Sequence, residues 1–527
     1  MSADSVGGAS PPIDSAPGPP ASRPAQFARR LTTFDLTNLG IGGIIGAGIF
    51  VLSGHAAARY AGPAVAVSFM FSGFGCLLCG LAYSELASMI PVAGSAYSYA
   101  TATLGGIAGW LIGWDLILEY TVGAATVSVG WSGYTCSILK DLGAACPAVL
   151  SSAPLARNAS GVLVWSGALC NAPAAFIAIA LTAVAVSGVQ QSARITNILV
   201  CIKIGVLLLF LISGVGFVKK ANWSPFFVPE DDRGRFGWWG LLSGSSVVFF
   251  SFIGFDAIST ACAEAVDPQK SIPRATMGAL GVCTTLYVLV ALVLTGLVPY
   301  PLLDAPDPIA VAVDAAGPGL SFVRPIIKVG AITGLTSVIL VLINGQARIT
   351  HAMASDGLLP PSLSAVDERT LTPSRALLWA GGSAAALAAF FPIDLLGEMV
   401  SIGTLAAFAF VCVGVLLLRR TKPDLPRPFS VPYSPWVPGA GATICVIQML
   451  ALPFETWLRL IVWMVIGGAV YQFYSRHHML PIEERVKRLL GEGGRTTLSS
   501  AEHPSPVPEV EAMVAARRGA HVQLVDW

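Results

Sequence analysis

The sequence predicts an all-α integral membrane protein with about twelve transmembrane helices, and its composition is the first reason. Apolar residues make up 54% of the 527 residues and charged residues only 12%, whereas a soluble domain carries about 25% charged residues. The mean hydropathy is +0.71. A formal net charge of +1 provides no basic surface for nucleic acid, so we expect no nucleic-acid partner.

The second reason is a series of apolar runs of about 20 residues, each able to cross the roughly 30 Å hydrocarbon core of a bilayer. Twelve runs follow one another, at residues 36–58, 63–89, 106–137, 172–188, 196–218, 237–262, 275–298, 323–353, 376–391, 399–418, 436–452 and 456–474. Residues 1–33 are rich in Pro, Ser, Gly and Ala, which predicts a disordered tail. Residues 475–527 form a second tail, and 34–474 the transmembrane domain.

The distribution of basic residues predicts the orientation. Basic residues gather in the loops on the side of the N-terminus, and the positive-inside rule makes that side cytoplasmic. They are Arg29, Arg30, Arg194, Lys270, Arg274, Arg348, Arg369, Arg375, Arg419, Arg420, Lys422 and Arg427. Lys219, Lys220, Arg233 and Arg235 are the main exception. We therefore expect a multi-pass protein of the cell membrane with both termini in the cytoplasm.

Two of the apolar runs are interrupted by glycine. Residues 40–50 (GIGGIIGAGIF) hold five glycines, and residues 249–256 (FFSFIGFD) form a second break-prone run five segments later. Backbone freed from a helix at membrane depth needs protein or ligand partners, because water is absent there. Paired breaks at corresponding places in two halves predict the substrate site of a transporter.

Four ionisable side chains lie at membrane depth, away from the ends of the predicted spans, where each costs about 2.5–3.5 kcal/mol to insert. Lys203 either snorkels to the interface or stays inside the bundle and exchanges protons during transport. Asp115 and Glu119 share a helix face, and the choice between an interfacial role and a coupling role stays open. Asp256 follows the second break, where it either caps unwound backbone or tunes a cation site.

The ten cysteines show no zinc or redox framework. Cys76 and Cys79 have the spacing of a redox pair, but their apolar helix favours simple packing. Cys146 and Cys170 flank a predicted outer loop, where a disulfide between them is an open possibility. Asn158 in that loop begins a glycosylation sequon. We expect no metal and no cofactor.

Several motifs in sequence order resemble the cationic amino acid transporter family of the amino acid/polyamine/organocation superfamily. They are GAGIFVL at 46–52, YSEL at 83–86 with PVAGSAY at 91–97, SFIGFD at 251–256 with DPQKSIP at 267–273, and GQAR at 345–348 with ASDGLLP at 354–360. The resemblance extends from Thr33 to about Tyr474. It implies a LeuT-type fold with inverted repeats at about 34–218 and 237–418, broken first and sixth helices, and two extra helices at 436–474.

The resemblance also implies an amino acid permease with a divided substrate site. The substrate carboxylate docks on amides of Gly46, Ala47 and Gly48, beside Ile44 and Ile45, at a half-helix N-terminus that favours an anion. The substrate ammonium is held by carbonyl groups of the sixth span. These carbonyls match Phe250, Ser251 and Ile253, and Phe250 is also a candidate aromatic lid.

Lys203 matches a lysine that replaces the second sodium ion in proton-coupled relatives. The resemblance implies that its ammonium bridges carbonyls of the first break and hydroxyls of Thr336 and Ser337 on the eighth span. We therefore expect a proton-coupled secondary transporter, with Lys203, Glu119 and Asp256 as the candidate coupling residues.

Substrate choice depends on the wall of the site. Leu335 lies where members with cationic substrates have a small residue, so we favour neutral amino acids over cationic ones.

An exchanger linked through Cys146 or Cys170 to a single-span partner is a second alternative, although no obligatory protein partner is evident. A channel or receptor would not need paired breaks. A membrane enzyme would need a metal or nucleophile cluster, which the six histidines do not provide.

Overall fold

The computed structural model describes residues 31–89, 95–103, 105–144, 146–157, 163–188, 193–231, 235–260, 265–320, 322–367, 369–370, 372–421 and 423–481. Most of both predicted tails, residues 91–94 of the second motif and Asn158 lie outside these ranges. Within them the chain is helical, apart from its connections and one antiparallel hairpin, β1 (Leu155–Arg157) with β2 (Leu163–Trp165).

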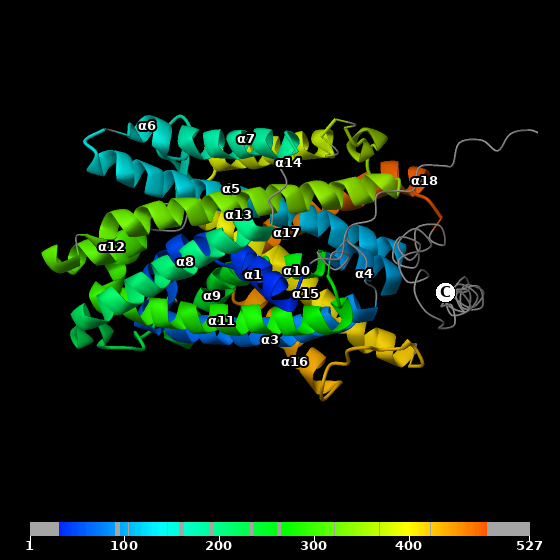
Figure 1. The fold of residues 1–527 in the computed structure, drawn as a ribbon, viewed down its shortest axis with the longest axis horizontal. Coiled ribbons are helices and arrows are strands. Elements are labelled where there is room, and N and C mark those ends of the chain that lie inside the picture. The colour runs from blue at the N-terminus through cyan, green and yellow to red at the C-terminus, as the bar shows by residue number, and fades with distance from the viewer. Residues whose placement is uncertain are drawn as a thin grey trace, which may run out of the picture.

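The long helices lie alongside one another (Figure 1). In chain order the α-helices are α1 (Thr33–Ile44), α2 (Ser53–Ala56), α3 (Val65–Met89), α4 (Ser95–Thr103), α5 (Gly106–Asp141), α6 (Ala148–Ser151), α7 (Ala172–Val186), α8 (Ala193–Gly214), α9 (Gly237–Val248), α10 (Ala257–Thr260), α11 (Pro268–Leu297), α12 (Pro308–Ala315), α13 (Val323–Ser355), α14 (Ser374–Phe390), α15 (Ile393–Thr421), α16 (Trp436–Leu450), α17 (Phe454–Val470) and α18 (Arg476–His478). Helices α5, α7, α13 and α14 lie on one side of the bundle and α3, α11 and α16 on the other, with α1 and α9 between them.

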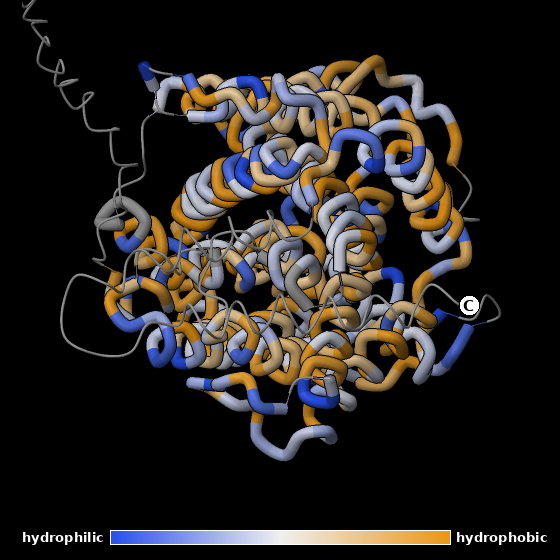
Figure 2. The backbone as a smooth tube through the Cα atoms, turned by 90° about the vertical axis from the view of Figure 1, so that its right-hand side faces the viewer, coloured by the Kyte–Doolittle hydropathy of each residue, from blue (hydrophilic) through white to orange (hydrophobic). Residues whose placement is uncertain are grey.

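Within the described ranges, seven helical stretches are long and apolar enough to cross a membrane, and α7 and α16 are shorter apolar helices. The predicted all-α membrane fold is confirmed. A helix lies in each of the twelve predicted runs, but the number of spans remains a prediction. Figure 2 looks along the bundle and shows hydrophobic residues at its rim as well as inside. Exposed side chains such as Phe176 and Ile212 account for that rim, as expected for a surface in contact with lipid.

Both predicted helix breaks are present. Helix α1 ends at Ile44, Ile45 is extended, and a π-helical turn, η1 (Gly48–Leu52), resumes the helical path. In the second break, α9 passes into a 3-10 turn, η6 (Phe249–Phe252), before extended Ile253. Gly254 then has a φ of 107°, a conformation that only glycine adopts without strain.

The two breaks touch through their backbones. A Cβ added at Gly43 would lie 3.0 Å from the carbonyl oxygen of Gly254, and a Cβ added at Gly254 would lie 2.8 Å from the carbonyl carbon of Gly43. Glycine is therefore needed on both sides of this contact. It brings two segments about 210 residues apart in sequence into register at the centre of the bundle.

Small residues also bring the long helices close together, as is typical of membrane bundles. Gly73 of α3 faces Thr284 of α11, and Gly381 of α14 faces Thr182 of α7 so closely that a side chain there would overlap it. These contacts fix the helices that surround the breaks.

The cysteines correct one prediction. Cys146 forms a disulfide with Cys136 at the end of α5, so its pairing with Cys170 is wrong, and Cys170 is free. The partner was missed because Cys136 belongs to an apolar run that predicts a helix. Cys79 is buried and its sulfur lies 3.5 Å from that of Cys445, which agrees with the predicted packing role.

Candidate functional site

The carbonyl groups released by the first break are paired by side chains from two other helices. The Lys203 ammonium on α8 donates to the carbonyls of Gly42 (2.7 Å) and Ile45 (3.0 Å). The Tyr287 hydroxyl on α11 donates to the carbonyl of Ile44 (2.9 Å). Three carbonyls that a continuous helix would have paired are thus paired through tertiary contacts, which stabilises the break at membrane depth.

Tyr287 also connects the two breaks. Its hydroxyl lies 3.0 Å from the carbonyl oxygen of Ser251 in the second break, besides its contact with Ile44 in the first. The ring packs against Phe69 and Phe252, with ring centres 5.5 and 5.3 Å away. The sequence analysis missed this residue, because an isolated tyrosine in an apolar run carries no signal of its partners.

The first break also leaves backbone N–H groups unpaired, on the C-terminal side of the carbonyls that Lys203 and Tyr287 bind. Within the described part of the chain, the N–H groups of Gly46, Ala47 and Gly48 have no hydrogen-bond acceptor. They lie at the start of η1, which continues into α2. Such a helix N-terminus favours an anion, because its N–H groups point outward and its dipole is positive.

A small cavity of about 10 Å³ lies between the two breaks, with room for about one water molecule. Helices α5 and α13 complete its wall. The lining residues are Gly43, Ile44, Gly46, Ala47, Gly48, Gly123, Val127, Phe250, Ile253, Val338 and Leu342. Six predicted site residues therefore lie on its wall: Ile44, Gly46, Ala47, Gly48, Phe250 and Ile253.

Three other predicted substrate residues are not on the cavity wall. Ile45 points its carbonyl to Lys203, and the carbonyl of Ser251 faces Tyr287. Leu335 is fully buried on α13 and does not line this cavity, so its predicted place in the substrate wall stays a prediction. Val338 and Leu342, one and two turns further along α13, do line it.

Lys203 does not snorkel to the interface. Its side chain is only 1% exposed, and its ammonium lies against the first break. The predicted bond to hydroxyls of α13 is wrong: Thr336 bonds Trp131 and the Ile332 carbonyl, and Ser337 donates to the carbonyl of Gly334.

The three predicted acids are buried in one region. Asp115 and Glu119 are each 2% exposed on α5, so neither carboxyl group faces an open vestibule, and the choice between a structural role and a coupling role stays open. One carboxylate oxygen of each has no hydrogen-bond partner among the described residues. Asp256 accepts a hydrogen bond from the Tyr120 hydroxyl at 2.7 Å. None of the three lines the cavity.

Ionic contacts and aromatic contacts lie on two sides of the cavity. On one side Asp304 bonds His55 at 3.0 Å and Arg59 at 2.9 Å, and Arg59 also approaches Asp394. Partial burial alone would raise the pKa of Asp304, but hydrogen bonds and charge from His55 and Arg59 lower it to about 2. Asp304 is therefore ionised at physiological pH, and its ion pair with Arg59 persists.

On the opposite side of the cavity, three aromatic rings pack together. Tyr83 of α3 contacts Phe255, just after the second break, and Phe408 of α15, with ring centres 5.5 and 5.2 Å away. Two broken helices that meet around a cavity in a membrane bundle define a membrane transporter of the broken-helix class.

Comparison with known proteins identifies the family. The amino acid permease family model matches residues 31–470. The chain is 43% identical over 459 residues to the methylthioribose transporter of Bacillus subtilis, covering 87% of this chain and 96% of that protein. It is 43% identical over 454 residues to the branched-chain amino acid permease BcaP of the same organism, covering 86% and 94%. It is also 38% identical over 403 residues to the vacuolar cationic amino acid transporter 4 of Arabidopsis thaliana, covering 76% and 65%.

This chain belongs to the amino acid permease family, within the amino acid/polyamine/organocation superfamily. It is a transporter and not an enzyme. The resemblance inferred from the motifs is therefore confirmed.

Gly48→Leu should abolish amino acid binding while the protein still inserts into the membrane. A Cβ at Gly48 would overlap the backbone of Ser251, and overpacking costs about 1–3 kcal/mol even where neighbours can shift. Binding is measured with labelled amino acids on purified protein. Gly281→Leu on α11 is the control, since a Cβ there meets nothing within 4 Å. Undiminished binding by Gly48→Leu would refute the site.

Tyr287→Phe should weaken substrate binding about tenfold, because an unpaired buried carbonyl costs about 1–3 kcal/mol and both breaks lose their shared donor. Equilibrium binding measures the change, and thermal unfolding checks that the fold persists. Tyr471→Phe removes a hydroxyl that contacts only the Met479 sulfur among the described atoms and should bind normally. Equal affinity in both variants would contradict a positioning role for Tyr287.

Proposed function

We propose that the protein is a proton-coupled secondary transporter of neutral, apolar amino acids that works by alternating access. The supporting observation is the position of the cavity, between the unpaired amides of the first break and the second break; it must widen to admit an amino acid. The substrate carboxylate binds the amides of Gly46, Ala47 and Gly48, and the ammonium binds carbonyls near Phe250 and Ile253. The two ends of a zwitterion thus contact two different half-helices.

The remaining wall supports an apolar side chain. Gly123 and Val127 of α5 and Val338 and Leu342 of α13 carry no charge or hydrogen-bonding side chain. Glu119 lies one turn from Gly123, but its carboxylate is outside the lining, so a cationic side chain would have no partner in this cavity. This favours branched-chain amino acids, as the name of one relative suggests, over cationic amino acids.

Proton coupling is proposed from the setting of Lys203. Its ammonium holds the first break and is shielded from water, so a change in its protonation would alter the hydrogen bonds of a helix that must move. Glu119 and Asp256 are further candidates, because both are buried carboxyl groups beside the second break. We also propose that the protein has the LeuT-type inverted repeat and lies in the cell membrane with both termini in the cytoplasm.

Uptake into proteoliposomes tests the proposal directly. A panel of labelled amino acids, with and without an imposed pH gradient, should show accumulation of leucine, isoleucine or valine that depends on the gradient. Methylthioribose belongs in the panel, because a transporter of that name is equally similar to this chain. Accumulation of methylthioribose alone would contradict the proposed zwitterion site, and uptake of arginine alone would contradict the neutral selectivity.

Leu342→Ala should shift preference toward larger apolar side chains by about tenfold, because a few methylene groups in a binding pocket are worth about 1–3 kcal/mol. Competition uptake assays measure the ranking of substrates. Leu335→Ala is the matched control: both leucines are buried on α13, but only Leu342 lines the cavity. A shift produced by Leu335→Ala alone would contradict the assigned wall.

Lys203→Met should remove the response to the pH gradient while equilibrium substrate binding remains measurable. Methionine keeps the apolar stem but has no ammonium to exchange a proton or bias the two access states. Uptake is compared at matched protein density across an imposed pH step. The control is Lys219→Met, which removes a lysine far from the breaks in sequence and in the fold. An intact pH response in Lys203→Met would refute proton coupling at this residue.

A further inference from the structure

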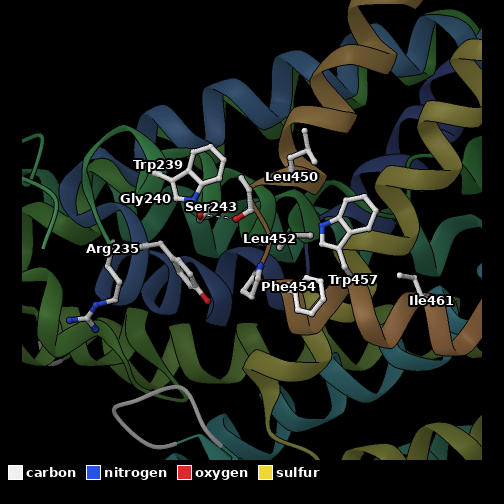
Figure 3. Close-up of a pocket in the computed structure, with 12 residues that line it drawn as sticks. Arg235, Trp239, Gly240, Ser243, Leu450, Leu452, Phe454, Trp457 and Ile461 are labelled. Atoms are coloured by element: carbon white, nitrogen blue, oxygen red, sulfur yellow. Dashed lines mark hydrogen bonds between the residues drawn. The ribbon is translucent and has the colours of Figure 1, made fainter. Parts of the chain in front are cut away.

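A second, larger cavity lies away from the substrate site, at the end of the bundle that carries Asp304. Its volume is about 670 Å³, within the roughly 300–1,000 Å³ of ligand pockets. The walls come from the π-helical turn η2 (Ala57–Ala61), from α9 and the residue Arg235 before it, and from the end of α16, the α16–α17 connection and the first half of α17 (Figure 3). The lining residues are Tyr60, Arg235, Trp239, Gly240, Ser243, Leu450, Ala451, Leu452, Pro453, Phe454, Trp457 and Ile461.

The walls of this cavity suit an acyl chain. Trp239, Leu450, Phe454 and Ile461 are apolar side chains that stay more than one third exposed, as expected of residues that face lipid. Figure 3 shows the rings of Trp239, Phe454 and Trp457 around the cavity. Tryptophan at the ends of membrane helices is typical of the region where acyl chains meet head groups.

Polar groups in the wall already have protein partners. The Ser243 hydroxyl donates to the carbonyl of Ala451 at 2.8 Å, and the Trp457 indole donates to the carbonyl of Met449 at 2.8 Å. The Tyr60 hydroxyl donates to Glu398 at 3.1 Å. A polar solute would therefore gain little from these groups, whereas an acyl chain would gain from burying apolar surface.

A pair of opposite charges lies at the edge of the cavity. Arg235 lines it, and its guanidinium contacts the Asp231 carboxylate at 2.7 and 2.8 Å. Both residues precede α9 and are partly exposed. Guanidinium groups bind phosphate well, because their N–H donors match two of its oxygens. The Arg235 guanidinium is therefore the group at this edge that suits a lipid phosphate.

We propose that this cavity binds one membrane phospholipid, with an acyl chain against Trp239, Phe454 and Trp457 and the phosphate on Arg235. The lipid comes from the leaflet at the Asp304 end of the bundle. It contacts η2 and α9, which are the continuations of the two broken helices on that side, together with the α16–α17 connection. Bound lipid therefore stabilises the arrangement in which these elements lie together.

Native mass spectrometry of the full chain tests the proposal. The protein is reconstituted in vesicles of phosphatidylethanolamine and phosphatidylglycerol, extracted in mild detergent, and the phospholipid retained is identified by its mass. Ile461→Trp should lower retention at least about fivefold, since overpacking costs about 1–3 kcal/mol. Val462→Trp is the matched control: these neighbours on α17 are 52% and 51% exposed, and only Ile461 lines the cavity.

A second pair of variants tests the head-group contact. Arg235→Gln should lower retention about tenfold, since hydrogen bonds to charged groups are worth about 1.5–3 kcal/mol. Asp231→Asn breaks the same ion pair but leaves the guanidinium for phosphate, so retention should be unchanged or higher. Equal losses in both variants would show that the ion pair only orders the loop, and equal retention by Ile461→Trp and Val462→Trp would place the lipid elsewhere. Either result would overturn the proposal.

Discussion

The central architecture depends on pairing the backbone groups that two helix breaks leave without helical partners inside a membrane bundle. Water is absent at this depth, so it cannot form hydrogen bonds with these backbone groups. Lys203 and Tyr287 therefore supply donors to the carbonyls of the first break, and the amides on its other side remain for an anion. The close contact of Gly43 with Gly254 brings both breaks to one place. The positions of α8 and α11 against α1 follow from these few contacts.

Much of the fold could be predicted from the sequence because apolar length and glycine content are local signals. The breaks near Gly46 and Gly254 were predicted correctly for that reason. The Cys136–Cys146 disulfide could not be, because Cys136 lies in an apolar helix and its partner is set by how the following loop folds back. The hairpin of β1 and β2 was missed similarly, since two strands of three residues leave almost no periodic pattern.

The backbone groups of the candidate site could be located from the sequence, because the glycine-rich breaks that expose them are local features. The side chains that reach the site from distant helices could not. Gly46, Ala47, Gly48, Phe250 and Ile253 line the cavity between the breaks, and their role in substrate binding stays a prediction. Leu335 lies outside this lining, because which of Leu335, Val338 and Leu342 faces the cavity depends on the tilt and height of α13, which hydrophobicity alone does not determine. The predicted contact of Lys203 with the hydroxyls of Thr336 and Ser337 was wrong because each hydroxyl donates to a carbonyl of its own helix, as serine and threonine commonly do in helices.

The bridging hydroxyl of Tyr287 has a consequence for motion between the two halves of the molecule. A hydroxyl carries a single proton, so at any moment it donates fully to one carbonyl and only weakly to the other. The link that Tyr287 makes between the two breaks is thus one shared hydrogen bond, with a net value of about 0.5–1.5 kcal/mol, and not two. In the proposed alternating-access cycle, a movement that separates the breaks would therefore have to break only one hydrogen bond at Tyr287.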